Sequence, residues 1–209
     1  MVHDVRHVEH RVGQKRGRFS RCDVLAVAAG TLGGAPLIER FLRAGNALAS
    51  RPSKAQDARI LQLVLLLEYT QVALYEQALR DAGLQGELRV FARTALGHER
   101  EHLAAIRKAL GSRARTKPRF DFAKSMTSQA AFLQTAIRLE DIAVAAYNGQ
   151  ATNLTEPTLA AAATIVSVEA RHASWVRAIG GKVAAPDAVD KPMTAQEAAD
   201  GLREIGLKP

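Results

Sequence analysis

The sequence predicts an all-α protein whose core is an antiparallel four-helix bundle. From about residue 54 onward, apolar residues recur with a period near 3.6, as they do on one face of a helix. Glycine and proline signals divide this region into segments of helical length, and its second half repeats its first half. The chain of 209 residues is 47% hydrophobic, which is enough for one domain with its own core and with extensions at both ends.

Four long helices are expected, each with an apolar stripe that holds one glutamate. Gly83 and Gly111 end the first two helices, and Pro157 opens the fourth. The connection between the second and third helices is the longest, so we expect a crossover there within an up-down-up-down bundle. The expected helices span residues 54–81, 86–110, 126–149 and 156–180.

Shorter segments flank the bundle domain at 54–181. Residues 182–209 are expected to form a linker and one short helix at about 194–205. Thr194 and Glu197 have the spacing of a capping box, in which the side chain of each residue binds the backbone of the other. This helix is therefore interpreted as an accessory to the bundle.

Residues 1–53 form a basic N-terminal arm with 9 Lys/Arg against 4 Asp/Glu. A basic stretch, the apolar run at 24–38 and the sequence NALA at 46–49 together resemble an export signal that is cleaved after Ala49. In a second interpretation, Pro36 opens a helix that docks on the bundle through an apolar face. The residues of that face are Ile38, Phe41, Leu42, Gly45 and Leu48.

The two interpretations of the arm leave two locations open, an exported or cell-envelope protein and a cytoplasmic one. No apolar run reaches the roughly 18 residues that span a bilayer, so membrane contact is expected only through the arm, if it is an export signal. The aromatic content of 5% argues against a specific nucleic-acid partner. Cys22 has no partner in the chain, so packing or a metal must stabilise the fold.

The two halves of the bundle are copies of each other. The sequence LLLEYTQVALY at 65–75 aligns with IRLEDIAVAAY at 137–147, and GHEREHLAAI at 97–106 aligns with SVEARHASWV at 167–176. The alignment pairs four residues with identical residues of the other half: Glu68 with Glu140, Tyr75 with Tyr147, Glu99 with Glu169, and His102 with His172.

Only one of the two histidines in the stretch GHEREH recurs. His102 faces His172 in the alignment, whereas His98 faces Val168. We therefore interpret His98 as a surface or interhelical pairing group, and expect its replacement to be close to neutral. A glutamate and a histidine three residues apart lie on the same face of a helix, so the second and fourth helices each bring two side chains to the centre.

The repeated residues make a candidate metal site. Four inward carboxylates would place four negative charges in an apolar core, where each unpaired ion costs several kcal/mol. No inner Lys or Arg is available, but two divalent metal ions would balance the charge, and two neutral imidazoles would complete their coordination. Oxygen and imidazole nitrogen ligands suit iron(II) or manganese(II). The candidate metal ligands are Glu68, Glu99, His102, Glu140, Glu169 and His172.

Two further expectations concern the surroundings of these ligands. Without metal, like charges in a poorly hydrated site should raise the pKa of all four carboxyl groups. Tyr75 and Tyr147 lie two turns beyond Glu68 and Glu140 on the same stripes. They either hydrogen-bond the ligand carboxylates or are ordinary core tyrosines.

The order Glu, Glu-x-x-His, Glu, Glu-x-x-His, with one element per helix, resembles that of the ferritin-like superfamily, and within it the bacterial ferritin-like domain proteins related to desiccation-associated proteins. The resemblance covers about residues 54–180. It implies a ferritin-like bundle that holds two iron ions within one chain, with manganese as the alternative metal.

The resemblance implies a di-iron oxidoreductase of the ferroxidase type, which binds Fe(II) and oxidises it with O2 or peroxide in iron handling or stress protection. Two alternatives stay open because the same fold hosts several functions: a manganese catalase-like peroxide dismutase, and a non-catalytic stress protein that sequesters metal or only packs. The expected partners are metal ions and O2 or peroxide. Both a single chain and a homo-oligomer are compatible with the sequence.

Overall fold

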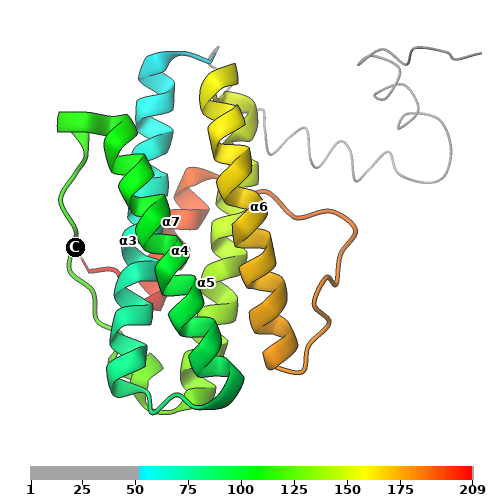
Figure 1. Cartoon of the computed structure of the whole chain (residues 1–209). Coiled ribbons are helices and arrows are strands. Elements are labelled where there is room, and N and C mark those ends of the chain that lie inside the picture. Colours follow the sequence, from blue (N-terminus) through cyan, green and yellow to red (C-terminus); the bar gives the residue numbers. More distant parts are fainter. Residues whose placement is uncertain (1–51, 209) are drawn as a thin grey trace, which may run out of the picture. The chain divides into compact units, whose positions relative to one another are not determined.

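The computed structural model describes residues 52–208. The export signal and the docking helix considered for the arm lie outside these residues. Within them, four long helices form a bundle and a shorter helix lies beside it (Figure 1). The helices are α3 (Lys54–Asp81), α4 (Gly86–Leu110), α5 (Gln129–Gln150), α6 (Glu156–Ile179) and α7 (Ala195–Ile205). None of the helices in this part of the chain has the length and hydropathy that a bilayer crossing requires.

A side-chain cap determines where the third long helix begins. Ser128 accepts a hydrogen bond from the backbone N–H of Ala131 at 3.1 Å, which satisfies a donor that the helix itself leaves free. α5 therefore begins at Gln129 rather than at the predicted residue 126. Ala123–Met126 form a turn of 3-10 helix instead.

The four long helices do not alternate in direction along the chain (Figure 1). α3 and α4 are joined by residues 82–85 and run antiparallel, as do α5 and α6. The crossover at 111–128 carries the chain back along the bundle: the backbone N–H of Gln85, ahead of α4, donates to the side chain of Gln129, at the start of α5, at 2.8 Å. α4 and α5 are therefore parallel, and the predicted up-down-up-down order is wrong.

The length of the crossover explains this topology. A 25-residue helix such as α4 is about 37 Å long at 1.5 Å per residue. An extended chain covers about 3.3 Å per residue, so residues 111–128 are long enough to return to the other end of the bundle. The result is two antiparallel helix pairs, α3 with α4 and α5 with α6, which correspond to the two copies in the sequence.

Two apolar clusters fill the bundle, and a polar layer lies where they meet. The larger cluster includes Tyr75, Phe91 and Phe132, all completely buried. The smaller cluster includes Ile60 near the start of α3 and Ile106 near the end of α4. On α4 and α6, a buried glutamate lies between the residues of one cluster and those of the other: Glu99 and Glu169. On α3 the two clusters interleave around the buried Glu68.

The short helix α7 packs against α5 and α3 (Figure 1). Its inner face buries Ala198, Leu202 and Ile205. The predicted capping box forms at its start, where the backbone N–H of Glu197 donates to the hydroxyl of Thr194 at 3.2 Å and the backbone N–H of Thr194 donates to the Glu197 carboxylate at 2.8 Å. α7 therefore extends the apolar core without reaching the polar layer.

Candidate metal centre

Each of the four long helices brings one glutamate into the interior of the bundle. These glutamates are completely buried: Glu68 on α3, Glu99 on α4, Glu140 on α5 and Glu169 on α6. His172 on α6 is 3% exposed, and the side chain of His102 on α4 is 11% exposed. The structure therefore brings the six candidate ligands into one layer of the bundle.

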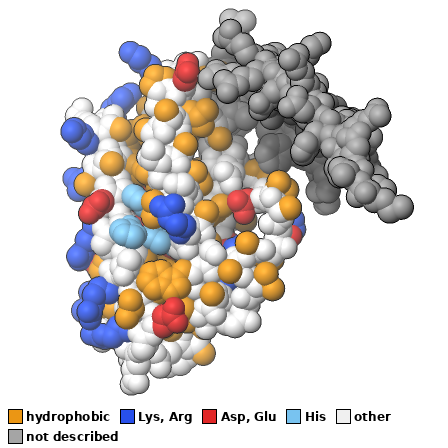
Figure 2. All heavy atoms as spheres, turned by 45° about the vertical axis from the view of Figure 1, so that its right-hand side comes forward, with side chains coloured by type: hydrophobic (Ala, Val, Ile, Leu, Met, Phe, Trp, Pro, Cys, Tyr) orange, Lys and Arg blue, Asp and Glu red, His pale blue; other side chains and the backbone are white. Residues whose placement is uncertain are grey.

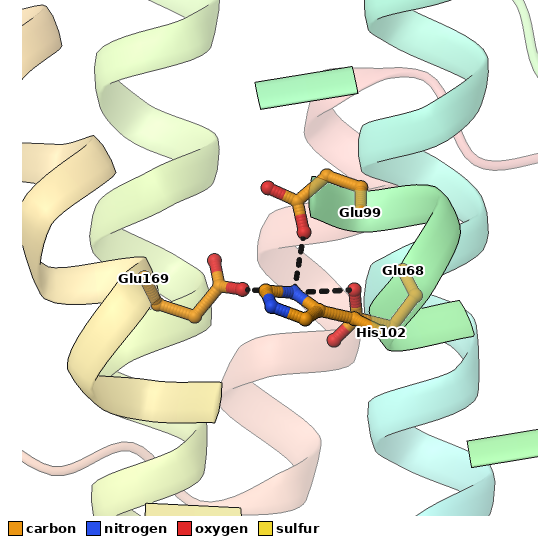
Figure 3. A group of neighbouring side chains, drawn as sticks. All are labelled: Glu68, Glu99, His102 and Glu169. Carbon is orange, nitrogen blue, oxygen red and sulfur yellow. Dashed lines mark hydrogen bonds and ion pairs between the residues drawn. The ribbon is translucent and has the colours of Figure 1, made fainter. Parts of the chain in front are cut away.

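A first group of four side chains converges around His102 (Figure 3). Glu68, Glu99, His102 and Glu169 each offer one ligand atom, and these atoms all lie within 4.8 Å of one another. The Nδ1 atom of His102 is 2.9 Å from Glu99 Oε2, 3.0 Å from Glu169 Oε1 and 3.6 Å from Glu68 Oε2. We call this group metal position 1.

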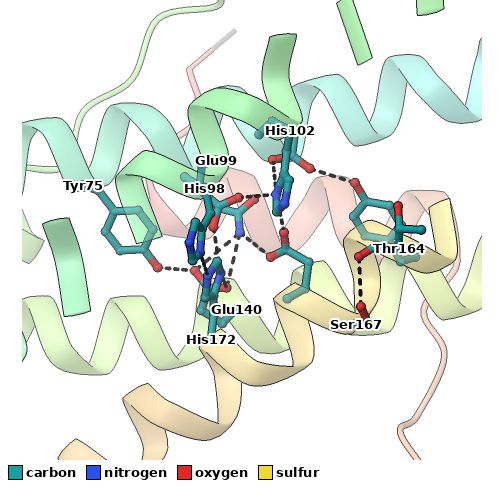
Figure 4. Close-up of polar contacts among 12 residues, drawn as sticks. Tyr75, His98, Glu99, His102, Glu140, Thr164, Ser167 and His172 are labelled. Atoms are coloured by element: carbon teal, nitrogen blue, oxygen red, sulfur yellow. Dashed lines mark hydrogen bonds and ion pairs between the residues drawn. The ribbon is translucent and has the colours of Figure 1, made fainter. Parts of the chain in front are cut away.

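A second group converges around His172 (Figure 4). It consists of Glu99, Glu140, Glu169 and His172, whose ligand atoms also lie within 4.8 Å of one another. The Nδ1 atom of His172 is 2.9 Å from Glu99 Oε1 and 3.7 Å from Glu140 Oε2. We call this group metal position 2. Glu99 and Glu169 belong to both positions, and Glu99 turns one oxygen toward each histidine.

The orientation of these atoms tests whether the site fits metal ions. Nδ1 of His172 and Oε1 of Glu99 are 2.9 Å apart, yet they are not aligned as a hydrogen bond. Buried polar atoms without a partner are costly, so they indicate a missing ligand. In the described part of the chain, four such atoms belong to the candidate ligands: Glu68 Oε2, Glu99 Oε1, Glu169 Oε1 and His172 Nδ1. Hard oxygens with imidazole nitrogens at two adjacent positions fit two divalent cations.

The histidines become strong bases in this layer when no metal is bound. Burial alone would lower the pKa of His102, but its contacts with three carboxylates outweigh burial and raise it to about 12. For His172 the contacts with Glu140 and Glu99 also outweigh burial and raise the pKa to about 10. Burial favours the protonated form of Glu99, but its contacts with both imidazoles lower its pKa to about 2.

The expectation that all four carboxyl pKa values rise holds for two of these groups and fails for Glu99. Burial raises the pKa of Glu68 to about 8, and it raises the pKa of Glu169 well above its ordinary value. The negative charge of Glu99 raises both values further. Glu99 differs because it lies between the two histidines. In the metal-free protein, two imidazolium groups therefore provide part of the positive charge that metal ions would supply.

Two tyrosines donate hydrogen bonds to carboxylates of this layer. The hydroxyl of Tyr147 donates to Glu68 at 2.8 Å, and the hydroxyl of Tyr75 donates to Glu140. Burial raises the pKa of both tyrosines well above the ordinary value, and the neighbouring carboxylates add to this effect. Both hydroxyls therefore keep their protons and remain donors. Each tyrosine comes from the opposite helix pair to the glutamate it contacts.

The sequence interpretation missed Gln71 and left His98 as a surface or interhelical pairing group, and both residues contact the candidate ligands. The side chain of Gln71, completely buried, donates to Glu169 at 2.9 Å. Its position three residues after Glu68 is a signal that the sequence offered, because that spacing places both side chains on one helix face. His98 is exposed, yet its Nδ1 lies 2.9 Å from Nε2 of His172. The repeat gave no signal for His98, since the aligned residue is a valine.

A surface hollow of about 380 Å³ opens between α4 and α6 and reaches the candidate metal centre. His102 and His172 both form part of its wall, and histidine atoms are visible on this face of the molecule (Figure 2). The hollow gives solvent and small molecules a route to the two positions. It is lined by His98, Glu101, His102, Val168, Arg171, His172 and Trp175.

Comparison with known families agrees with this arrangement. A family model described as a ferritin-like domain matches residues 56–182, which include every candidate ligand and all of the four long helices except the first two residues of α3. The comparison with curated proteins returns no match. The match covers more than half of the chain and ends before α7. Together with the four-helix bundle and its buried glutamate and histidine layer, it shows that this chain belongs to the ferritin-like domain family.

Proposed function

We propose that the protein is a ferroxidase-like dinuclear-metal protein, which binds two Fe(II) ions in the bundle and oxidises them with O2 or peroxide. The observation that carries this proposal is the pair of adjacent ligand groups that share Glu99 and Glu169. Two cations held by shared carboxylates are close enough to act on one small oxidant. Bound iron would supply the two electrons that O2 takes up on reduction to peroxide.

The residues of the chain would bind, orient and shield the two ions. His102 and His172 would each bind through Nδ1, the nitrogen that faces the carboxylates. Metal binding would remove the proton that Nδ1 carries in the metal-free protein, so protons are released on loading. The hydroxyls of Tyr147 and Tyr75 would hold Glu68 and Glu140 in position. The apolar clusters on both sides would exclude water except through the hollow.

Anaerobic titration with Fe(II) tests the dinuclear site, and we expect saturation near two equivalents per chain. Addition of O2 should then oxidise both equivalents, and the absorbance of ferric iron measures this oxidation. The double variant Glu99→Ala, Glu169→Ala removes both of the ligands that the two positions share and should bind neither ion. A parent stoichiometry near zero, or an unchanged stoichiometry in the double variant, contradicts the proposal.

The catalase-like alternative is tested on the same preparations. The protein loaded with Mn(II) should release O2 from hydrogen peroxide at a high turnover if it is a peroxide dismutase. We expect only slow release from this form, and rapid oxidation of the iron form by O2. The ligand chemistry suits both metals, so metal analysis of the protein as purified identifies the ion that it carries.

A further inference from the structure

We infer that the two metal positions are unequal, and that position 2, formed by Glu140 and His172, binds its ion more tightly than position 1, formed by Glu68 and His102. This inference rests on the proposed dinuclear site. It comes from comparing the two halves of the repeat in three dimensions. The metal ligands and tyrosines recur in both halves. Among the described residues, two others hydrogen-bond the ligands; they do not recur, and both contact position 2.

The first of these residues is His98. When a metal ion binds Nδ1 of His172, the hydrogen of that neutral ring must be on Nε2. Nε2 of His172 lies 2.9 Å from Nδ1 of His98, and the two rings are stacked with an interplanar angle of 10°. Nε2–H of His172 therefore donates to His98, which fixes the ring and makes Nδ1 a better ligand. His98 is thus a positioning residue for position 2.

The second residue is Gln71. Its amide nitrogen donates to Glu169 at 2.9 Å and lies 3.4 Å from both oxygens of Glu140. Glu140 is a ligand of position 2 only, and Glu169 is shared. A carboxylate has more lone pairs than one metal bond uses, so Gln71 can hold these groups in place while they bind an ion. Because Gln71 already holds Glu140, this side chain loses less conformational freedom when it binds an ion.

Position 1 shares the Gln71 contact with Glu169, but it has no equivalent of the contacts that Gln71 makes with Glu140 and that His98 makes with His172. The repeat places Ala143 where the first half has Gln71, and Val168 where it has His98. Neither side chain has a hydrogen-bonding group. Among the described residues, none makes a hydrogen bond to the outer nitrogen Nε2 of His102, whose ring lines the hollow. Its side chain is 11% exposed, against 4% for His172. Solvent must therefore satisfy the outer nitrogen of His102.

The difference gives the two positions different roles. The ion at position 2 has fixed ligands and a more buried histidine, so it should fill first and stay bound. The ion at position 1 depends on a histidine at the wall of the hollow, so it should exchange with solution. Loss of contacts of this kind costs about 10–100-fold in metal affinity. We therefore expect the two affinities of the parent protein to differ by about this factor.

Titration of the metal-free protein with Mn(II) measures both affinities, because the EPR signal of the free ion gives the concentration of unbound Mn(II) at each step. The parent should bind two equivalents in two separate steps. Glu140→Gln should remove the tight step and Glu68→Gln the weak step, which assigns each step to its position. Two steps of equal affinity in the parent, or the opposite assignment, overturn the inference.

The repeat supplies matched variants, since His98 of the first half aligns with Val168 of the second half and each can be replaced by the other residue type. His98→Val should weaken the tight step by about 10–100-fold and leave the weak step unchanged. Val168→His should strengthen the weak step, because its side chain lines the hollow beside His102. The double variant His98→Val, Val168→His should make position 1 the tighter one. Added to this double variant, Glu68→Gln should then remove the tight step. If His98→Val leaves the tight step unchanged, His98 is not a positioning residue and the inference fails.

Folding and the dinuclear site are checked separately. His98 is exposed and Val168 half-buried, so both variants should keep the parent's circular dichroism and melting temperature without metal. In the Zn(II)-loaded parent, the Nε2 proton of His172 should exchange slowly in NMR spectra, and it should exchange fast in His98→Val. A parent that binds no Mn(II), Zn(II) or Fe(II) contradicts the proposed function itself, whereas two equal sites contradict only the inequality of the positions.

Discussion

Glu99 belongs to both candidate metal positions. Its two oxygens point to different histidines, with Oε2 at 2.9 Å from His102 and Oε1 at 2.9 Å from His172. These contacts keep Glu99 ionised inside an apolar core, with a pKa lowered to about 2. One helical residue can serve both positions because it lies between them in the polar layer.

Replacement of Glu99 should therefore affect both ions, unlike replacement of a glutamate that serves one position. We expect Glu99→Gln to weaken both binding steps by at least about 10–100-fold. Glu101→Gln is the matched control, because Glu101 is an exposed residue two positions along the same helix. It should bind two ions like the parent. Inductively coupled plasma analysis after dialysis against Mn(II) gives the stoichiometry, and a Glu99→Gln protein that retains two ions excludes the shared role.

Tyr147 should contribute to position 1 through its hydrogen bond to Glu68 at 2.8 Å. We expect Tyr147→Phe to lower the affinity of the weaker step by about 10–100-fold. Removal of the hydroxyl also leaves a buried carboxylate oxygen without its donor, at a cost of about 1–3 kcal/mol in the free energy of unfolding.

A control for this change is available on α3. Tyr69 is also buried, but its hydroxyl donates to the backbone oxygen of Arg115 in the crossover at 3.2 Å. Tyr69→Phe should leave both metal affinities unchanged. Isothermal titration calorimetry with Mn(II) and urea unfolding compare the two variants. Equal metal affinities in both would show that Tyr147 only packs in the core and does not support position 1.

At the scale of elements, close contact with α5 fixes the chain that follows α6. The backbone N–H of Met193 donates to the backbone oxygen of Ala145 at 2.9 Å. Gly149, one turn further along α5, permits this approach, since a Cβ atom there would lie 1.8 Å from the backbone oxygen of Met193. A glycine inside a helix costs stability by itself, so its presence here reflects the packing of two backbones.

Substitution of two helical glycines should have opposite effects. Gly149→Ala should lower the free energy of unfolding by about 1–3 kcal/mol, as overpacking does, because the clash is with backbone that cannot rotate away. Gly97→Ala should raise it by about 0.5–1 kcal/mol, because a Cβ atom there has no neighbour within 4 Å. Urea unfolding measures both changes. A Gly149→Ala protein as stable as Gly97→Ala would show that the segment before α7 does not pack on α5.

At the scale of the whole molecule, we expect the polar layer to make stability depend on pH, and added metal to oppose that dependence. Without metal, the folded state raises the pKa of Glu68 from 4.5 to about 8 and that of His172 from 6.5 to about 10. Groups with raised pKa values stabilise the fold while they are protonated, and this stabilisation is lost as pH rises toward the folded-state pKa. With metal, deprotonated ligands are required, so metal binding strengthens as pH rises.

The metal-free protein should therefore have a falling melting temperature between about pH 5 and pH 10. In excess Mn(II), the gain in melting temperature over the metal-free protein should increase across the same range. Glu99, with its pKa lowered to about 2, adds stability above its ordinary pKa and loses it below, so metal-free stability should also fall in strong acid. Thermal melts in chelator and in Mn(II) provide the data.

One variant isolates the contribution of Glu68 to the dependence of the melting temperature on pH. Glu68→Gln resembles the protonated glutamic acid at every pH, so the metal-free variant should lose the part of the slope between pH 4.5 and about 8. It should melt above the parent at pH 9, where the parent must ionise Glu68. A metal-free parent that becomes more stable from pH 5 to pH 9 contradicts the buried, proton-holding layer.

The sequence by itself determined the helices and the candidate ligands of this protein. A period of 3.6 and the turn signals located four long helices, because one apolar face must be buried whatever its partner is. The duplicated Glu-x-x-His spacing selected His102 over His98, since three residues bring two side chains to one helix face. The error in the start of α5 was small and local, and came from the Ser128 cap.

Only the tertiary structure decided how the helices are directed and how the ligands are shared. The crossover at 111–128 permits either direction for α5, and packing selected the one parallel to α4. Spacing along one helix says nothing about distances between helices, so it could not reveal that Glu99 lies against both histidines. Nor could it reveal that Gln71 and His98 both contact position 2. Side-chain contacts between helices depend on the angles at which the helices cross and on how deeply each side chain is buried. Both are set only when the four apolar faces pack together.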